Sequence, residues 1–284
     1  MAAVSRVGPV RSGPHTSTRL HRRRGTCRAF SGPPARARVP AFLPQAEGHY
    51  AGMPGKALLV IQMDKARDDR VSAWLTRHGY ELDYRFAAHG DALPDPATAD
   101  HELAVVYGGP QSANETDEKP YLQDEIEFIR GWCDRERPLL GLCLGAQLLG
   151  KAYGGQVGPH PDGLNEIGYA DIAPTMAGRE LIPEPMRVFH WHTEGVETPP
   201  DGERLAEGAV FPNQAFRLGA HAYGLQFHPE TTVEIFSNWI QEAGHMLEWP
   251  GAQPKDAIFA DAKQYDPKLA QWLDGFMQRW LGER

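Results

Sequence analysis

Between residues 57 and 153, short runs of apolar residues alternate with longer segments in which apolar residues recur at every third or fourth position. The short runs predict buried β-strands, and the longer segments predict amphipathic helices. The predicted strands are Ala57–Met63, Tyr80–Arg85, Leu103–Tyr107 and Leu139–Leu142, and the predicted helices are Asp69–His78, Lys119–Arg135 and Leu144–Tyr153. This alternation predicts an α/β fold with a doubly wound, mostly parallel sheet, whose functional site lies at the carboxyl ends of the strands.

The pattern changes after residue 153. Gly154–Phe227 contains short apolar segments separated by proline and glycine, which predicts an antiparallel extension of the sheet. Thr231–Leu247 and Leu269–Leu281 both show helical spacing of apolar residues. We expect the second helix to pack on its own domain, the alternative being a surface for a dimer partner or a synthetase. The sequence thus predicts a main domain over residues 53–247 and a helical extension over residues 248–284.

Charge is distributed unevenly along the chain. Residues 1–52 contain nine arginines, no lysine and a single acid, Glu47, which gives this segment a net charge of +8. Since the whole chain has a net charge of −8, the part from Met53 onward carries −16. The first 52 residues are rich in Gly, Pro and Ser and lack helical or strand periodicity, so we expect a disordered basic arm.

Three explanations of this arm compete. An organelle-targeting segment fits its arginine-rich, acid-poor composition, and a nucleic-acid-binding tail fits Arg22-Arg23-Arg24. We favour the third, that translation begins at Met53, because the first predicted strand begins only a few residues later at Ala57. The acidic charge of the remaining chain argues against nucleic acid as its substrate or partner.

Composition otherwise favours a cytoplasmic protein, with organelle targeting by residues 1–52 as the less favoured alternative. No run of about eighteen apolar residues occurs, so we expect no membrane-spanning helix and no membrane partner. The chain has three cysteines, Cys27, Cys133 and Cys143, which are too few and too irregularly spaced for a disulfide framework.

One of these cysteines lies where a predicted strand meets a predicted helix. The sequence Gly141-Leu142-Cys143-Leu144-Gly145 is the thiol form of the Gly-x-Ser-x-Gly nucleophile elbow. Glycines flank such a turn because a Cβ there would clash with the strand or with the start of the helix. The N–H groups and positive dipole at the helix start favour the thiolate. The pattern therefore indicates a nucleophilic cysteine, the alternative being a buried structural one.

A base for this thiol follows about eighty residues later. The segment Ala222–Phe227 predicts a buried strand, and His228-Pro229-Glu230 comes directly after it. Proline ends the strand, and residues two apart on an extended chain point the same way, so Glu230 can orient the imidazole. A cysteine, a histidine and a carboxylate in these roles form an activated nucleophile.

A glycine-rich turn comes before both elements. Gly108-Gly109-Pro110 follows the strand predicted at Leu103–Tyr107. Such an open turn exposes backbone N–H groups, which can form half of an oxyanion hole. The other half would come from the N–H of Leu144, the residue after the nucleophile.

These motifs, in this order, resemble those of the class I glutamine amidotransferases between about residues 57 and 235. The matching motifs are Gly-Gly-Pro, then Gly-x-Cys-x-Gly-x-Gln, then Gly-x-Gln-Phe-His-Pro-Glu. The whole chain is most similar to stand-alone members related to the amidotransferase domain of GMP synthase. The resemblance implies a flavodoxin-like α/β fold and makes residues 53–247 a glutamine amidotransferase-like catalytic domain.

The resemblance also implies roles for individual residues. Cys143 would be the nucleophile, His228 the base and Glu230 the group that orients it. The N–H groups of Gly109 and Leu144 would form the oxyanion hole.

For substrate binding, the resemblance points to Gln147, which would help to hold glutamine, and to Gly108 and His192. His192 lies where many members carry a His-Gly-Asp segment beside the pocket. Here Thr193 and Glu194 replace the last two residues of that segment, so no substrate role is assigned to Glu194.

The expected function is glutaminase-type hydrolysis of a γ-glutamyl amide through a cysteine thioester, with ammonia passed to a separate synthetase subunit. One alternative is a free-standing γ-glutamyl peptidase or hydrolase acting on a small γ-glutamyl compound. The other is a non-enzymatic binding or regulatory member, against which the intact Cys143, His228 and Glu230 argue. Since no metal-ligand spacing, dinucleotide motif or phosphate loop is apparent, we expect no metal and no cofactor.

Overall fold

The computed structural model describes residues 55–63 and 68–282. Within these ranges the helices and strands follow one another in the order β1 Lys56–Val60, α1 Arg70–Arg77, β2 Glu81–Arg85, β3 Leu103–Val106, α2 Pro120–Cys133, β4 Leu139–Leu142, α3 Leu144–Ala152, β5 Val157–Pro159, β6 Glu166–Pro174, β7 Met186–His192, β8 Glu194–Val196, β9 Gly202–Gly208, β10 Ala215–Leu218, β11 Ala222–Leu225, α4 Val233–Ala243 and α5 Lys255–Leu281. Short 3₁₀ helices cover Ala87–His89, Ala177–Glu180 and Gly244–Glu248. The arm at residues 1–52 and Cys27 lie outside the described residues.

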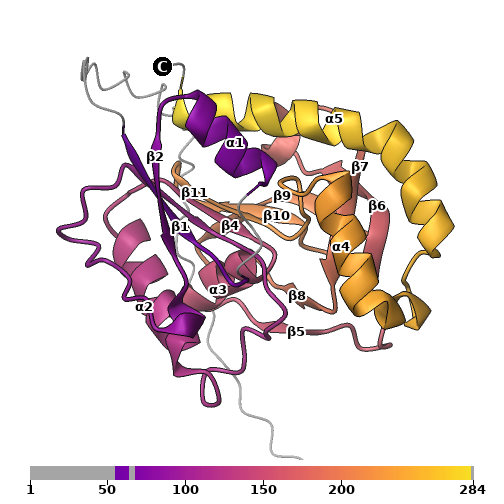
Figure 1. Cartoon of the computed structure of the whole chain (residues 1–284), viewed down its shortest axis with the longest axis horizontal. Helices are drawn as coiled ribbons and strands as arrows, with labels where there is room; N and C mark the ends of the chain where they lie inside the picture. The colour runs from indigo at the N-terminus through magenta and orange to yellow at the C-terminus, as the bar shows by residue number, and fades with distance from the viewer. Residues whose placement is uncertain (1–54, 64–67, 283–284) are drawn as a thin grey trace, which may run out of the picture. The chain divides into compact units, whose positions relative to one another are not determined.

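Nine strands form one sheet in the order β2-β1-β3-β4-β11-β10-β9-β6-β7 (Figure 1). Every pair from β2 to β11 is parallel, and every pair from β11 to β7 is antiparallel. Strands β5 and β8 form a separate two-stranded sheet. The predicted α/β fold, mostly parallel sheet and antiparallel extension are therefore confirmed.

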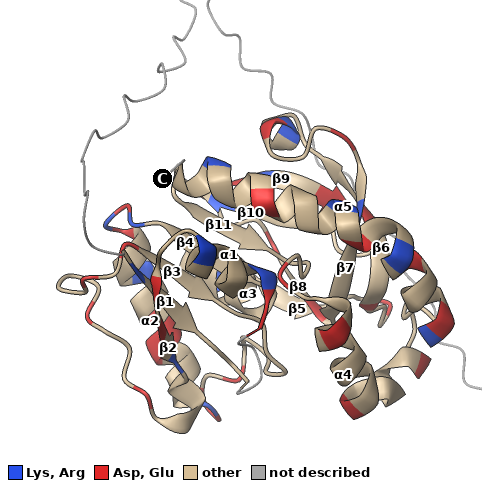
Figure 2. Ribbon diagram, turned by 45° about the horizontal axis from the view of Figure 1, so that its top comes forward, with Lys and Arg blue, Asp and Glu red and all other residues tan. Residues whose placement is uncertain are grey.

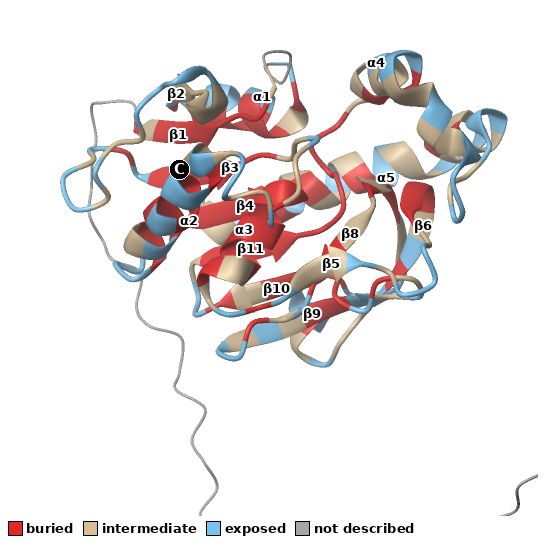
Figure 3. Cartoon of the chain, turned by 90° about the horizontal axis from the view of Figure 1, so that it is seen from below, coloured by how far each residue is buried: buried red, intermediate tan, exposed pale blue. Residues whose placement is uncertain are grey.

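Alternate residues of β1 enter two different hydrophobic clusters, because successive side chains on a strand point to opposite faces. Ala57 and Leu59 pack with residues of α1, α4 and α5, whereas Leu58 and Val60 pack with residues of α2 and α3. The sheet is thus covered by helices on both faces, as the doubly wound prediction required. In Figure 3 the central strands and α3 are almost wholly buried, and in Figure 2 the charged residues fall mainly on helices and loops.

Helix α5 is longer than the sequence pattern predicted. It begins at Lys255 rather than near Leu269, and it contains Pro267. A proline inside a helix usually marks a helix start or a break, which is why the first half was not predicted. The predicted Thr231–Leu247 helix is shorter than expected, since α4 ends at Ala243 and continues as a 3₁₀ turn.

The apolar stripe of α5 packs on the core of the main domain, as expected from its spacing. Leu269, Leu273, Phe276 and Met277 are buried in the same cluster as strands β1, β3 and β4. Figure 1 shows α5 running past α1 and over β7 and β6. The helix at residues 255–281 is therefore part of the main hydrophobic core. None of the helices in the described ranges is long and apolar enough to cross a membrane.

Truncating Phe276 to alanine tests this docking. Its ring is 3 % exposed, stacks on Trp272 at 5.4 Å and meets Tyr223 edge-on at 5.4 Å. Loss of a buried aromatic ring typically costs about 3–5 kcal/mol of unfolding free energy. We expect a loss of this size in urea unfolding, whereas the exposed neighbour substitution Gln278→Ala should stay within about 0.5 kcal/mol of wild type. Equal stability of all three proteins would mean that α5 does not support the core.

Candidate active site

Cys143 sits at the junction of β4 and α3 in a strained backbone conformation. Its φ is 49° and its ψ is −104°, and only one other non-glycine residue in the described part of the chain, Glu136, has a positive φ. The flanking glycines are needed for steric reasons. A Cβ on Gly141 would lie 2.5 Å from the carbonyl oxygen of Gly145, and a Cβ on Gly145 would overlap the carbonyl of Val106. Strain of this kind concentrates at functional sites. Cys143 thus has the strained strand-to-helix turn of a nucleophile elbow.

His228 and Glu230 lie just beyond the end of β11, the strand next to β4. Nδ1 of His228 is 2.7 Å from Oε1 of Glu230, and both side chains are buried. Because the carboxylate accepts at this distance, Nδ1 carries the proton and Nε2 faces away from Glu230. The backbone N–H of His228 also donates to the carbonyl of Phe189 at 2.8 Å, which fixes the imidazole beside β7.

Burial alone would lower the pKa of His228, but the charge of Glu230, then that of Cys143, raises it above its usual range. The arrangement therefore favours an imidazolium beside the thiol. Nε2 of His228 is buried and has no hydrogen-bond partner among the described atoms. Catalytic hydrogen bonds are often long before substrate binds, so an Nε2 without a partner is compatible with proton exchange between this nitrogen and the Cys143 thiol.

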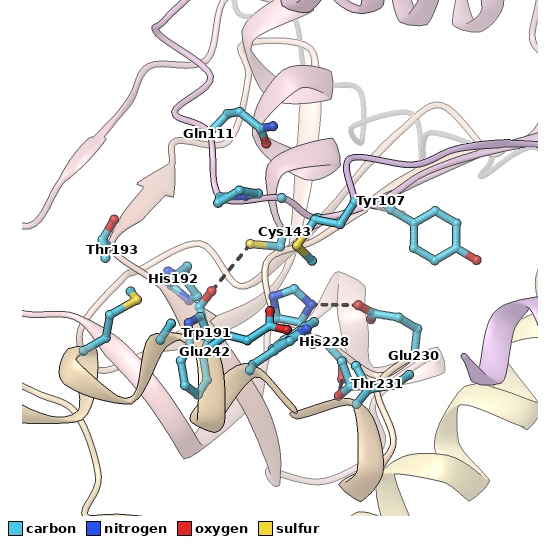
Figure 4. A pocket seen from close by; sticks show the side chains of 18 of the residues that line it. Tyr107, Gln111, Cys143, Trp191, His192, Thr193, His228, Glu230, Thr231 and Glu242 are labelled. Carbon is cyan, nitrogen blue, oxygen red and sulfur yellow. Dashed lines mark hydrogen bonds and ion pairs between the residues drawn. The ribbon is translucent and has the colours of Figure 1, made fainter. Parts of the chain in front are cut away.

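Gly108 brings the third motif against the other two. A Cβ at this position would lie 2.9 Å from Cε1 of His228 and 3.2 Å from Cβ of Cys143, so only glycine fits here. Figure 4 shows the thiol of Cys143 and the His228–Glu230 pair around one hollow. Sequence motifs that lie far apart along the chain thus meet at the carboxyl ends of β3, β4 and β11.

The loop at Gly109 lies against Gln62, which forms a buried polar pair with Glu125 that the sequence pattern did not reveal. A Cβ on Gly109 would overlap the side chains of Gln62 and Gln111. Nε2 of Gln62 donates to Glu125 Oε2 at 2.7 Å, and burial raises the pKa of Glu125 to about 8. The pattern could not reveal this pair, because Glu125 lies on the predicted apolar side of a helix. The oxyanion roles of the Gly109 and Leu144 N–H groups stay predictions.

Gln147 and His192 both line the cavity, and their side chains form hydrogen bonds within its wall. The Nε2 of Gln147 donates to the carbonyl of Glu194 at 2.8 Å, and Nδ1 of His192 donates to the same carbonyl at 3.0 Å. The carboxylate of Glu194 accepts a hydrogen bond from Ser112 at 2.6 Å. These contacts fix the position of the chain after β7, and the substrate-binding roles of Gln147 and His192 stay predictions.

Asp69 is a second pocket residue that the sequence did not reveal. It caps α1 by accepting from the N–H groups of Val71 and Ser72, and both its oxygens lie 3.2 Å from the hydroxyl of Tyr107. Burial raises the pKa of Asp69 to about 6, and the charge of Glu230 adds to the shift. Its role as a helix cap was readable, but its position beside Glu230 depends on the tertiary fold.

A cavity of about 510 Å³ opens beside Cys143. One wall is the loop from Gly108 to Gln111, and another is the end of β7. The opposite wall comes from α4 and the turn after it, and it is largely apolar and aromatic. Trp191 lines the cavity from β7, and the opposite wall includes Ile235, Trp239, Met246 and Trp249. The cavity has the size of a pocket for a small organic molecule.

Alkylation distinguishes the two described thiols. Cys143 lines the cavity, whereas Cys133 packs in the core between α2 and the sheet, where burial raises the pKa of its thiol to about 12. Since the thiolate is the reactive form, we expect iodoacetamide to label Cys143 well before Cys133 in the folded protein. A time course of peptide mass spectra measures both rates, and equal rates would contradict an activated Cys143. Unfolded protein, in which both thiols should react alike, is the control.

Comparison with known proteins shows the family of the chain. A family model for glutamine amidotransferase class-I matches residues 67–243. The glutamine amidotransferase-like protein YfeJ of Salmonella typhimurium is 34% identical over 216 residues, which is 71% of this chain and 88% of that protein. One of the subunits of the glutamine-hydrolyzing GMP synthase of Natronomonas pharaonis is 32% identical over 157 residues, or 51% of this chain and 77% of that relative.

Among solved structures, a glutamine amidotransferase from Thermotoga maritima superimposes with a TM-score of 0.72 at 27% identity, covering 82% of this chain and 100% of that one. The family match spans the elbow, the His228–Glu230 pair and the loop at Gly108. The chain therefore belongs to the class I glutamine amidotransferase family.

Proposed function

We propose that this protein hydrolyses a γ-glutamyl amide through a thioester on Cys143. The proposal rests on two groups that line one cavity. These are a cysteine on a strained elbow and a histidine paired with a buried carboxylate. The positive φ of Cys143 costs free energy that the rest of the fold must offset. A non-enzymatic protein would not need this conformation.

The proposed reaction begins with transfer of the thiol proton of Cys143 to Nε2 of His228. The thiolate sulfur attacks the γ-carbonyl carbon, and the carbonyl electron pair moves to the oxygen, where the N–H groups of Gly109 and Leu144 would stabilise it. The tetrahedral intermediate then expels the amine as the C–N bond breaks. His228 gives its proton to that amine, and Glu230 stabilises the imidazolium until then.

The second half of the reaction removes the γ-glutamyl group from sulfur. His228, now neutral, accepts a proton from water, and the resulting hydroxide attacks the thioester carbon. Collapse of this second intermediate breaks the C–S bond and releases glutamate, and His228 returns the proton it took from water to the sulfur, which restores the thiol. Atoms and charges balance over the cycle: one amide and one water give one carboxylic acid and one amine.

The apolar wall of the cavity favours a second candidate within the same chemistry. Trp191, Trp239 and Trp249 line the same cavity as Cys143, and such residues bind a larger apolar leaving group better than they bind ammonia. One candidate is therefore a free-standing γ-glutamyl hydrolase. The other is a glutaminase that supplies ammonia to a separate synthetase, which is supported by the names of several relatives that are GMP synthase subunits.

A substrate panel separates the two candidates. Glutamate release is measured from glutamine and from γ-glutamyl amides with methyl, benzyl and phenyl leaving groups. A free-standing hydrolase should show kcat/KM at least ~10-fold higher for the aromatic amides than for glutamine, because burying a ring contributes about 1.5–3 kcal/mol. Higher kcat/KM for glutamine would favour the ammonia-supplying enzyme, and no release from any member of the panel would contradict the proposed hydrolysis.

A further inference from the structure

Three side chains with metal-binding atoms meet at the edge of the sheet, next to the cavity. Glu166 and His192 face each other directly across β6 and β7, and His190, two residues before His192, points to the same face of the sheet. All three side chains are buried. Among the described residues, this is a cluster of one carboxylate oxygen and two ring nitrogens within 4.8 Å of one another.

The distances within this cluster match those of a metal-binding set. Oε2 of Glu166 is 3.2 Å from Nε2 of His192 and 3.6 Å from Nδ1 of His190, and the two nitrogens are 3.2 Å apart. Ligands at about 2.0–2.2 Å from a tetrahedral zinc ion lie about 3.3–3.6 Å from one another. The triangle therefore already has the size of three corners of a zinc tetrahedron.

Hydrogen bonding within this cluster leaves a buried ring nitrogen without a partner. Nδ1 of His192 donates to the carbonyl of Glu194 at 3.0 Å. In a neutral imidazole Nε2 therefore has no proton and carries a lone pair. That lone pair faces an oxygen of Glu166 and the Nδ1 of His190. A neutral His190 has one N–H. On Nδ1 it can donate to Nε2 of His192, and the Nε2 of His190 is then a buried acceptor without a partner. A cation in the centre would bind all three lone pairs at once.

The surroundings resemble the outer contacts of a metal site. A ligating histidine almost always donates its other N–H to a carbonyl or carboxylate, as His192 does to Glu194. Gln214 donates to Oε2 of Glu166 at 2.6 Å, and its own amide oxygen is buried without a hydrogen-bond partner. Two histidines and one glutamate leave a fourth position for water.

We propose that Glu166, His190 and His192 form a binding site for a divalent transition-metal ion of the zinc type. A bound ion would lock the ring of His192, which lines the cavity beside Cys143. The ion would thus join β6 to β7 at the point where β7 lines the cavity. The proposal stands on these three residues and does not depend on the reaction proposed above.

Cobalt(II) binding to the metal-free full-length protein tests the site. Four-coordinate cobalt shows intense visible d–d absorption, and thiolate ligands add a near-ultraviolet charge-transfer band. We expect one equivalent of cobalt to give the visible bands without the thiolate band, and zinc to displace it. A thiolate band would assign the ion to a cysteine, and no visible bands would mean that no such site forms. Either result would overturn the proposal.

Variants locate the ion within the chain. His190→Gln and Glu166→Gln keep approximate size but each removes one ligand, so we expect a loss of cobalt affinity greater than the roughly 10- to 100-fold that loss of an outer contact costs. His245→Gln, an exposed histidine outside the cluster, is the matched control and should bind like wild type. Unchanged affinity in both cluster variants would overturn the site.

Thermal unfolding of the wild-type protein keeps the test independent of whether the variants fold. A ligand that binds only the native state raises the melting temperature as its concentration exceeds Kd. We expect zinc to raise the melting temperature of the wild-type and His245→Gln proteins by several degrees. A melting temperature unaffected by zinc would contradict a site built from three buried side chains.

Discussion

Replacing Cys143 with alanine should lower turnover of the protein's γ-glutamyl substrate by at least ~10⁴-fold, because the variant has no atom that can form the thioester. The fold should survive. Alanine is smaller than cysteine, the side chain faces a cavity, and the strained backbone is held by Gly141 and Gly145 on either side. Glutamate release measured at saturating substrate, together with a circular dichroism spectrum matching wild type, checks both parts.

Cys133→Ala is the matched control for this result. That cysteine is equally buried but packs in the core on α2, so its loss should cost some stability and leave turnover close to wild type. Near-wild-type turnover by a well-folded Cys143→Ala protein would rule out the proposed nucleophile, whatever its effect on stability.

The His228–Glu230 pair should behave as one unit when it is taken apart. Glu230→Gln keeps the size of the side chain and one acceptor oxygen but removes the charge that raises the pKa of His228. We expect a loss of at least ~10-fold in kcat and a larger loss for His228→Ala, which deletes base and acid together. The double variant should be little slower than His228→Ala alone, since Glu230 acts through the imidazole.

The pH profile distinguishes this role from a structural one. A negative charge near an imidazole favours its protonated form, so removing the charge of Glu230 lowers the pKa of His228. The limb of the kcat profile that reports loss of the imidazolium proton should therefore move to lower pH in Glu230→Gln. Losses that add in the double variant, with an unmoved profile, would show that Glu230 acts on substrate or fold instead.

The parts of the site that were predictable from the sequence are those encoded locally. Gly141, Cys143 and Gly145 define the elbow within five residues, and the reason for each glycine is a contact with the adjoining strand or helix. His228 and Glu230 are two residues apart, so an extended backbone already places them side by side. Short-range geometry of this kind follows from strand and helix periodicity alone.

The parts that escaped prediction depend on long-range register. Glu166 meets His192 only because β6 and β7 pair with one particular register, and a shift by one residue would separate them. Asp69 reaches the pocket because α1 packs near the end of β11. The first half of α5 was hidden by Pro267, which the surrounding helix tolerates. No local pattern carries these facts.

The proposed reaction requires Cys143 to take the γ-glutamyl group onto its sulfur. A glutamine analogue with a diazoketone in place of the amide reacts irreversibly with such a nucleophile, and mass spectrometry of the digested protein then identifies the labelled residue. We expect one label per chain on Cys143, loss of activity in proportion to labelling, and protection by substrate. A label on another residue that accompanies the loss of activity, or an active enzyme with Cys143 fully labelled, would contradict it.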